Sequence, residues 1–414
     1  MWTLRLSCGS AAVPIMKNLS RSIFQSMSIG SAIGSLLISF GQPASALQFK
    51  KLIETGQTIP GNNQPLTVIE SPTIGRDGQA AVYLKTKSVT VNGSDFFSTT
   101  QFVGIYSIGQ SGNISLLDQG ATVSSARTAT VNTFTAPSIS QGKIAYLTYS
   151  LTSDRGSEST PISILKVGTP GDVKQYGNII SGYYVRGIPN VSFTNGMVYG
   201  LETSLILSRP PIDGGRVKLL NINSPTPAFT TLSTSVDNTA IRSGSQSVVL
   251  LSVDPNKVHK LFERPNNGPF VQLNPQGQNP GSCGFAVSSE NVVSCSVAGS
   301  QYVLSVRFGK ASNFVSLPLP NAATLKSVSD PSISNNKIIF KTTEQDPNGS
   351  IVEKIYLSNK NQAPQLIVSS GQVIDGKTIT GLKLNTYGRT IADNYVVFIG
   401  TFSDSSQALY RIDL

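Results

Sequence analysis

Side chains that could perform nucleophilic or acid–base chemistry are few in this sequence, and they do not cluster. The chain has a single histidine, His259, and no cysteine lies near it in the sequence. A metal centre or a histidine base needs partner groups at short range, so we predict neither at His259. The Gly-x-Ser-x-Gly turn of serine hydrolases is absent, and the segment RSGSQ that begins at Arg242 is interpreted as a turn.

Paired carboxylates are the stronger enzymatic alternative, because glycosidases place two acids across one bond. The candidate acids of this chain fall mostly in turns or at strand ends, where a carboxylate caps the local backbone, and they do not recur at one repeat position. A fold can still bring two of them together, so this alternative stays open. The candidates are Glu54, Asp77, Asp118, Glu202, Asp237, Glu290, Asp330, Glu344 and Asp393.

A calcium loop is a weaker alternative at the segment DPNGS, from Asp346 to Ser350. Oxygen-bearing side chains stand at its alternate positions. The segment lacks the downstream glycine and closing glutamate of a calcium loop, so we interpret it as an Asx turn. We expect no metal and no cofactor.

Two cysteines are predicted to form a disulfide. Cys8 lies in the N-terminal segment described next, which leaves Cys283 and Cys295. An even pair in an oxidising compartment favours a bridge over a metal site or a nucleophile. If the turn between them is the three residues Ser288 to Glu290, antiparallel pairing brings residue 283 opposite residue 295. The alternative is two buried free thiols.

The first 46 residues have the features of an export signal. They contain no acidic residue, and a basic start with Lys17 and Arg21 precedes an apolar run from Met27 to Phe40. Ala44-Ser45-Ala46 is a small-x-small cleavage site before Leu47. The apolar run is short for a membrane span, and no second apolar segment follows. We therefore expect export to the periplasm or the cell exterior, with a mature chain that begins at Leu47.

The charge of the mature chain is modest. Met16 precedes the basic pair, so residues 1–15 are an over-extended start in one interpretation. Removing the signal takes away three basic residues and lowers the formal net charge from +10 to +7. Nucleic-acid binders concentrate arginine in stripes with aromatic residues, which are absent here, so we expect no nucleic-acid partner. The most basic cluster is interpreted as a solvated strand edge, with polyanion binding as the alternative. It contains Lys257, His259, Lys260 and Arg264.

A short phrase that recurs seven times is the strongest feature of the sequence. Each copy has a polar or proline-containing lead-in, a β-branched residue, a polar turn, and two or three apolar residues. This order predicts a tight hairpin between two buried strands. The copies are SPTIGRDGQAAVY around Ile74, APSISQGKIAY around Ile139, IPNVSFTNGMVY around Val191, TAIRSGSQSVVL around Ile241, GFAVSSENVVS around Val287, DPSISNNKIIF around Ile333 and RTIADNYVVF around Ile391.

The spacing of the phrases predicts the fold. Successive copies lie 46 to 65 residues apart, which is the length of a four-stranded propeller blade with variable loops. Two more apolar runs follow most copies, such as 104–108 and 113–117 after the first. Only 13% of residues are charged, and 37 Gly and 23 Pro suit many short strands. We predict an all-β protein, a seven-bladed β-propeller with four-stranded blades, in which residues 47–414 form one domain.

The two ends of the chain are predicted to complete one blade. After the seventh phrase only one strand remains, at 408–414, so the last blade lacks a strand. The segment LIETGQTIPG at 52–61 matches IVSSGQVIDG at 367–376, which follows the sixth phrase. We therefore expect a strand near 49–54 to pair with 408–414, which closes the ring and removes the open edge between the first and last blades.

Aromatic residues leave two interpretations. One repeat position carries Tyr146, Tyr199, Phe340 and Phe398. Since it also accepts Val and Leu in other copies, we expect packing between sheets rather than sugar-binding platforms. Carbohydrate binding remains a second hypothesis, although the only tryptophan, Trp2, lies in the signal. Its candidate exposed aromatic residues are Phe96, Phe97, Tyr183 and Tyr184.

The repeats resemble an uncharacterised family of secreted bacterial propeller-repeat proteins. The motifs that carry the resemblance are APSISQGKIAY, GIYSI, GQ-x-I-x-G and the ending TITGL...NYVVFIGTFSDSSQALYRIDL. The resemblance covers residues 47–414 and is weakest in the fourth and fifth copies. It implies a secreted propeller and no particular activity.

These observations favour a non-catalytic role. We expect an exported, monomeric propeller scaffold that presents loops to a protein or polysaccharide partner. The long connections at 85–101 and 148–160 are the predicted contact segments. The alternative is a carbohydrate-active or carbohydrate-binding propeller, meaning a glycosidase, a lyase or a lectin-like protein.

Overall fold

Every regular element in the described part of the computed structural model is a β-strand, which confirms the all-β prediction. No helix in that part is long and apolar enough to cross a membrane. The predicted signal, with Ala46, and the aromatic residues Phe96, Tyr183 and Tyr184 lie outside it, whereas Leu47 lies inside. The described residues are 47–92, 97–125, 128–154, 157–158, 162–180, 191–203, 215–254, 256–265, 268–298, 301–320, 323–360, 362–386 and 388–414.

The described strands form five hydrogen-bonded sheets. The first contains β2 (Thr58–Ile59), β3 (Asn62–Ile74), β4 (Ala80–Thr86), β5 (Val89–Asn92), β6 (Phe97–Ile108), β7 (Ile114–Ser125), β8 (Thr128–Phe134), β9 (Ser138–Ser140), β10 (Lys143–Asp154), β11 (Ser157–Glu158), β12 (Ile162–Thr169) and β13 (Asp172–Ile180). The second contains β14 (Val191–Thr194), β15 (Met197–Thr203), β16 (Gly215–Asn221), β17 (Phe229–Ser243), β18 (Ser247–Val253), β19 (His259–Pro265) and β20 (Val271–Leu273).

The remaining sheets come from the C-terminal half and the first strand. The third contains β21 (Phe285–Ser288), β22 (Asn291–Ala298), β23 (Gln301–Arg307) and β24 (Val315–Leu317). The fourth contains β25 (Leu325–Ser334), β26 (Lys337–Gln345), β27 (Ile351–Asn359) and β28 (Gln365–Ser369). The fifth contains β1 (Gln48–Glu54), β29 (Val373–Ile374), β30 (Lys377–Lys383), β31 (Ile391–Ala392), β32 (Tyr395–Phe402) and β33 (Gln407–Asp413).

Each of the seven phrases forms an antiparallel hairpin, as predicted. The hairpins are β3–β4, β9–β10, β14–β15, β17–β18, β21–β22, β25–β26 and β31–β32. We call each hairpin, together with the strands that follow it, a unit, and number the units 1 to 7 along the chain. In five hairpins the first turn residue has a positive φ, which short polar side chains tolerate better than β-branched ones. These residues are Gln141, Asn195, Ser289, Asn335 and Asp393.

Buried apolar side chains of the described residues form seven clusters, and each cluster joins two units. Six clusters join units that are consecutive in the chain; Leu147 of unit 2, for example, packs with Phe193 of unit 3. The seventh joins unit 7 to unit 1 and contains Leu409 and Ile69. The repeated aromatic position is buried in these clusters, which confirms its packing role. Its members are Tyr146, Tyr199, Phe340 and Phe398.

Hydroxyl groups on the first strands of the hairpins also join neighbouring units. The N–H of Ser243 in unit 4 donates to Ser192 Oγ in unit 3 at 2.8 Å. The N–H of Asp393 in unit 7 donates to Ser334 Oγ in unit 6 at 2.8 Å. The polar lead-in of the phrase thus has a structural cause, because the hydroxyl satisfies a backbone donor that burial would otherwise leave unpaired. The same bond recurs with Ser138, Ser140 and Ser332 as acceptors.

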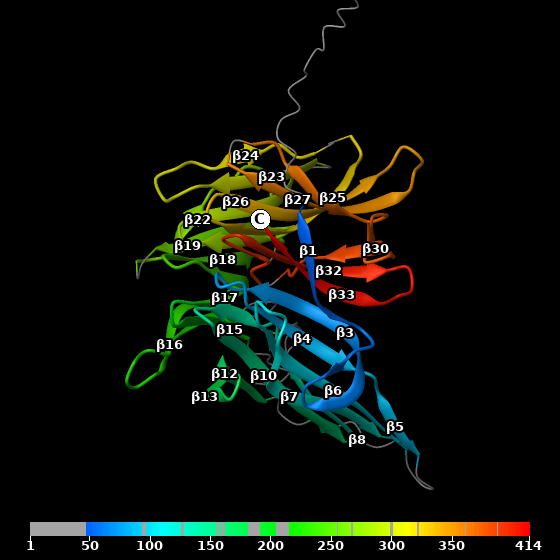
Figure 1. Cartoon of the computed structure of the whole chain (residues 1–414). Helices are drawn as coiled ribbons and strands as arrows, with labels where there is room; N and C mark the ends of the chain where they lie inside the picture. Colours follow the sequence, from blue (N-terminus) through cyan, green and yellow to red (C-terminus); the bar gives the residue numbers. More distant parts are fainter. Residues whose placement is uncertain are drawn as a thin grey trace, which may run out of the picture. The chain divides into compact units, whose positions relative to one another are not determined.

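The N-terminal strand β1 pairs with the C-terminal strand β33, and these are the two segments that the sequence predicted to pair. The antiparallel register runs from Gln48 opposite Asp413 to Glu54 opposite Ala408. Figure 1 shows β1, in blue, beside the red strands β32 and β33. The last three strands of the chain therefore gain a neighbour from its beginning.

The matched segments that follow β1 and β28 also fold alike. The N–H of Gly56 donates to the carbonyl of Leu66 at 2.7 Å, and the N–H of Gly371 donates to the carbonyl of Ile379 at 2.8 Å. Both glycines have a positive φ, of 91° and 86°. This equivalence places β1 in unit 7 at the position that β28 has in unit 6.

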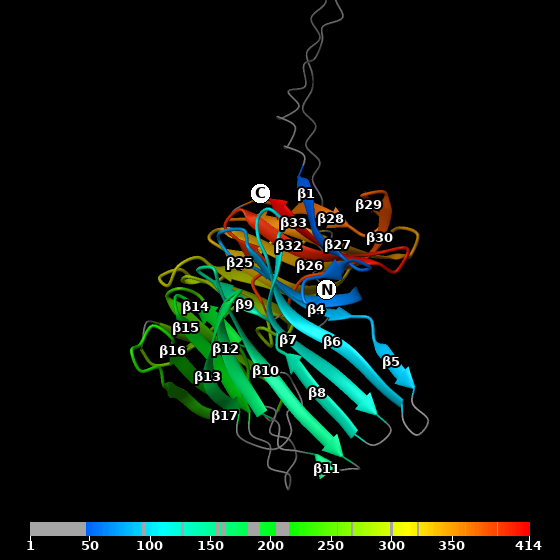
Figure 2. The same ribbon diagram turned by 60° about the horizontal axis from the view of Figure 1, so that its bottom comes forward.

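Units 1 and 2 differ from the separate four-stranded blades that the sequence predicted. The long strands β6, β7, β8 and β10 continue beyond their units, and β7 pairs with β8, which merges both units into one twelve-stranded sheet (Figure 2). The prediction of loops at 85–101 and 148–160 was wrong, because these segments contain β5, the start of β6, the end of β10 and β11. Their Thr, Ser and Val residues suit extended strands. Units 3 and 4 likewise share β17.

The hairpin between the cysteines has a shorter turn than predicted. The turn consists of Ser289 and Glu290 alone, because Ser288 faces residue 291. Cys295 therefore lies opposite Gly284 rather than opposite Cys283. The N–H of Cys295 donates to the carbonyl of Gly284 at 2.9 Å. Gly284 has a φ of 113°, which bends the chain and places the Cα of Cys283 5.1 Å from that of Cys295. The two sulfur atoms are bonded in this structure.

Candidate functional site

The hairpin turns of units 1 to 5 and the segment leading into the hairpin of unit 7 line one cavity of about 330 Å³. Each of the five turns contributes at least one polar residue to the lining of this cavity. The volume falls at the lower end of the range of about 300–1,000 Å³ that is usual for small-molecule sites. The lining includes Asp77, Gln141, Asn195, Ser245 and Ser289, one from each of units 1 to 5, together with Arg76 and Arg389.

The turn side chains also contact one another. Gln141 Nε2 donates to Asn195 Oδ1 at 3.4 Å. The carboxylate of Asp393 accepts a hydrogen bond from Asn335 Nδ2 at 3.0 Å and lies 3.8 Å from Arg76 Nε. Asparagine, glutamine and serine can donate and accept, so this rim can bind a ligand rich in hydroxyl or carbonyl groups.

Arg389 is the most constrained cation of the cavity. Its N–H donates to Thr73 Oγ1 at 3.2 Å, and its carbonyl accepts the N–H of Ile74 at 2.9 Å, so unit 1 fixes its backbone. Arg389 lines this cavity and a second cavity of about 30 Å³. Burial, and then the positive charge of Arg76, lower the pKa of Arg389, because both disfavour its charged form.

A second buried cation, Arg242, lines the smaller cavity. Its Nη1 donates to the carbonyl of Ile241 at 2.7 Å, and its Nη2 donates to the carbonyl of Thr386 at 2.6 Å. Its guanidinium lies 5.4 Å from the ring centre of Phe285. Arg242 thus connects unit 4 to the segment that leads into the hairpin of unit 7.

The predicted candidate acids bind cations rather than each other in the described residues. Lys166 Nζ lies 2.6 Å from Asp118 Oδ2, and Lys310 Nζ lies 3.4 Å from Glu290 Oε1. Glu344 is buried and lies 2.7 Å from Lys354 Nζ. Asp77 and Asp393 belong to the turns described above, and Asp330 lies within β25, where its φ is 53°. The side chains of Glu202 and Asp237, and their contacts, lie outside the description. These contacts assign structural roles to Asp118, Glu290 and Glu344.

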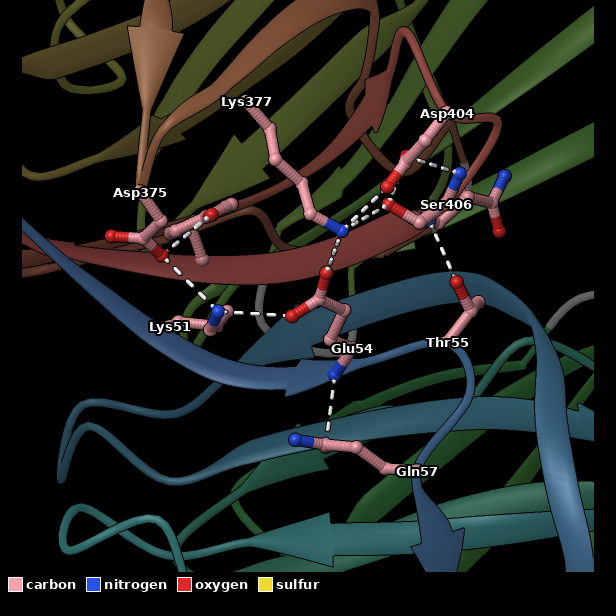
Figure 3. A network of polar contacts seen from close by, with 10 residues as sticks. Lys51, Glu54, Thr55, Gln57, Asp375, Lys377, Asp404 and Ser406 are labelled. Atoms are coloured by element: carbon pink, nitrogen blue, oxygen red, sulfur yellow. Dashed lines mark hydrogen bonds and ion pairs between the residues drawn. The ribbon is translucent and has the colours of Figure 1, made fainter.

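Glu54 belongs to a polar network that joins β1 to unit 7 (Figure 3). Its Oε1 lies 2.7 Å from Lys377 Nζ, and its Oε2 lies 2.9 Å from Lys51 Nζ. Lys377 also lies 2.7 Å from Asp404 Oδ2, and Lys51 lies 3.3 Å from Asp375 Oδ2. The lysines lower the pKa of Glu54, and the carboxylates raise the pKa of Lys377. Because it connects the chain ends, we assign this network to the closure of the last unit.

His259 has no catalytic partner set in the described residues. Burial lowers the pKa of His259, and no described group pairs with its buried Nδ1. No group of three or more His, Cys, Asp or Glu side chains within the described ranges could hold a metal ion. In the basic cluster around it, His259, Lys260 and Arg264 pair with β18 alone, because β20 pairs only with Leu261 to Glu263 of β19. Lys260 Nζ lies 3.6 Å from Asp254 Oδ2.

The segment that begins at Asp346 is an Asx turn, as predicted. Asp346 Oδ1 accepts the N–H of Asn348 at 2.9 Å and the N–H of Ser350 at 2.7 Å. The carboxylate is thus engaged with its own backbone.

A larger cavity of about 630 Å³ lies against the edge strand β24. Phe308, Val315, Leu317 and Lys360 are among its lining residues. It contains fewer convergent polar groups than the turn-lined cavity, which combines groups from several units. Convergent polar groups fix the orientation of a ligand, so we take the turn-lined cavity as the candidate site.

Comparisons with known proteins identify no family. The sequence matches no family model and no curated protein. The acylaminoacyl peptidase of Pyrococcus horikoshii has a TM-score of 0.47 and 12% identity, and the match covers 80% of this chain and 48% of the peptidase. The β-propeller domain of the Trilobed protease from Pyrococcus furiosus has a TM-score of 0.42 and 7% identity, with 65% and 79% coverage. A putative TolB from Agrobacterium tumefaciens has a TM-score of 0.39 and 12% identity, with 77% and 98% coverage.

These similarities do not support a statement about the activity or the partner of this chain. This chain spans about half the length of the Pyrococcus horikoshii peptidase. All three TM-scores lie below 0.5, so no activity or partner of these proteins is assigned to this chain. The function must be argued from the site itself.

Sequence reasoning missed Arg76 and Arg389 as cavity residues. The phrases did contain a usable signal, because their turn residues occupy one equivalent position, and the turns of units 1 to 5 line the same cavity. Arg76 immediately precedes the turn residue Asp77 in the first phrase, and Arg389 opens the seventh phrase.

Proposed function

We propose that residues 47–414 form a closed, seven-bladed β-propeller that serves as a non-catalytic binding scaffold. The seven hairpin units support the blade count, and so do the seven clusters that join each unit to the next. The pairing of β1 with β33 and the cluster between units 7 and 1 support closure. In this arrangement β1 is the outermost strand of the last blade.

The observation that carries the binding role is the cavity lined by the turns of several units. A rigid ring fixes the positions of its turns while their side chains remain free to vary, which is how many scaffolds hold binding residues. Glu54, Asp118, Glu290 and Glu344 each pair with a lysine, which favours binding over carboxylate catalysis. The partner in this proposal is a protein or a polysaccharide that contacts the turns.

Export is part of the proposal. The basic start, the apolar run and the Ala44-Ser45-Ala46 site support removal of the first 46 residues. N-terminal sequencing of the exported protein is expected to find Leu47 as the first residue. Retention of residues 1–46 would contradict the proposed export.

Site-directed photo-cross-linking tests the binding face. A photoreactive residue replaces Ser245 in the turn of unit 4, and a matched variant carries it at Val271, whose side chain is 56% exposed on the edge strand β20. In the producing cells, we expect a cross-linked partner from position 245 and none from position 271. Cross-links from position 271 alone, or none from position 245, contradict the proposed binding face.

A further inference from the structure

The arginines of the described residues show how this fold normally satisfies a guanidinium that leaves water. Arg307 donates to both carboxylate oxygens of Glu263, at 2.9 and 2.7 Å. Arg411 donates to Asp413 at 2.8 and 3.2 Å. Arg242 and Arg264 donate to backbone carbonyls. A buried guanidinium in this protein therefore has an oxygen partner.

Arg389 departs from this rule. Its side chain is partly buried, yet within the described ranges its guanidinium has no hydrogen bond and no ion pair, and only its backbone is bonded. Removing a guanidinium from water without an acceptor is unfavourable. The fold keeps it there, and Arg389 lines a cavity large enough for a ligand. An anion in that cavity would supply the missing acceptor.

The charges of the lining specify what kind of anion fits. Arg76 and Arg389 contribute two positive charges to the lining and Asp77 contributes one negative charge, and Asp393, outside the lining, lies 3.8 Å from Arg76 Nε. Arg389 is therefore the lining arginine that lacks an ion pair among the described residues, and at most one positive charge of the lining is left to be balanced. A group with one negative charge matches this balance better than a doubly charged phosphate. A carboxylate also matches the planar fork of a guanidinium, which can donate to both of its oxygens.

The other lining residues indicate which kind of molecule the carboxylate belongs to. Gln141, Asn195, Ser245 and Ser289 surround the arginines and offer amide and hydroxyl groups from four units. These groups complement a molecule with several hydroxyls. The lining residues that the structure describes include no aromatic side chain, so recognition would depend on hydrogen bonds rather than ring stacking. An acidic peptide side chain would leave most of these groups without partners.

We propose that the turn-lined cavity binds an acidic sugar, with the sugar carboxylate on Arg389 and Arg76 and the sugar hydroxyls on the turn residues. This inference rests on the proposed scaffold function and names the ligand chemistry of the same cavity. It makes the polysaccharide partner a polymer that contains uronic acid residues.

Isothermal titration of the mature protein with sodium glucuronate tests the proposal. We expect saturable binding to the wild-type protein and no comparable binding of glucose. Arg389→Gln should weaken glucuronate binding by about tenfold or more, because it removes the charged donor fork. Arg389→Lys should weaken it less, since it keeps the charge and loses the fork. Arg216→Gln, a change of an exposed arginine on β16, should leave binding unaltered.

Each contrary result has a distinct meaning. Equal binding of glucose, or unchanged binding by Arg389→Gln, overturns the role of the carboxylate. Acetate or phosphate binding as tightly as glucuronate overturns the sugar, and tighter binding of a tetra-aspartate peptide makes the ligand an acidic protein segment. If Arg389→Gln does not fold, Arg389→Lys and Arg76→Gln must still weaken binding. A cross-link from position 245 without glucuronate binding retains the scaffold and rejects this ligand.

Discussion

The carboxylate of Glu54 and the ammonium of Lys377 lie 2.7 Å apart, although 323 residues separate them in the chain. Thr55 adds a second link, because its Oγ1 accepts the N–H of Gln407 at 2.9 Å. Both links connect the segment around β1 to the C-terminal unit that it completes. The two ends of the chain are therefore joined by side-chain contacts as well as by the pairing of β1 with β33.

Packing at this closure is expected to dominate its stability. Leu409 on β33 is fully buried between units 7 and 1, so Leu409→Ala should lower the free energy of unfolding by about 2–5 kcal/mol. Val315→Ala, at a side chain that is 51% exposed, should change it by less than about 0.5 kcal/mol. Urea unfolding of the two variants gives the comparison. Equal effects, or an unchanged melting curve after deletion of residues 408–414, would remove the closure from the account.

The ion pairs at the closure predict a pH dependence. Lys377 lowers the pKa of Glu54, so the stabilisation from Glu54 is complete above the usual carboxyl pKa and is lost as the pH falls through the folded-state value. The raised pKa of Lys377 means that its stabilisation is lost as the pH rises through its folded-state value. Lys377→Met should therefore destabilise most between about pH 5 and pH 10.

Unfolding of Lys377→Met and wild type across the pH range measures this difference. Lys383→Met changes an exposed lysine of the same strand β30 and serves as the control. The Lys377→Met effect should shrink below about pH 4, where the free carboxyl group is protonated. A difference that stays constant down to strongly acid pH would show that the ion pairs do not contribute.

The cysteine pair makes a separate prediction about the mature protein. Its non-reduced form should be two hydrogens lighter than its reduced form, because Cys283 and Cys295 are bonded. The closed loop is short, so reduction should lower the free energy of unfolding by something on the order of 3 kcal/mol. Mass spectrometry after alkylation makes the test, with Cys283→Ser as the control that cannot form the bridge. Two freely alkylated thiols in the untreated protein would rule out the disulfide.

The hydroxyls between units predict a cost for serine substitutions. Ser192→Ala leaves the N–H of Ser243 without its acceptor, in a buried position, so we expect a loss of about 1–3 kcal/mol. Ser111→Ala, at an exposed side chain, should have little effect. Thermal unfolding of both variants decides the matter, and equal melting temperatures would show that the inter-unit hydroxyls are not needed for stability.

The repeat made much of this fold predictable from the sequence. Alternating apolar and turn residues determine local hairpins, and Tyr146 and Phe398 show that one position packs between sheets in several copies. The match between the segments after Leu52 and after Ile367 also predicted the partner of β33. These features depend on residue types at fixed spacing, which a single sequence displays directly.

Two other features depend on information that spacing does not contain. The apolar pattern between Cys283 and Cys295 permits a turn of two or three residues, and only the positive φ of Ser289 selects the shorter one. The extended strands of units 1 and 2 pair through polar Thr and Ser residues, which also favour loops. The role of Arg389 was hidden for a related reason, since a partly buried guanidinium is visible only when its neighbours are placed.

Closure is the claim on which the cavity depends, since the turn-lined cavity includes Arg389 of unit 7, and a disulfide scan tests it most directly. Gln48 and Asp413 are exposed and face each other on β1 and β33, so Gln48→Cys/Asp413→Cys should cross-link on mild oxidation. Gln48→Cys/Gln301→Cys pairs β1 with an exposed residue of another sheet and should not cross-link. Peptide mapping is expected to find the 48–413 bridge in the folded protein. Its absence, or equal cross-linking in the control pair, would contradict the closed ring.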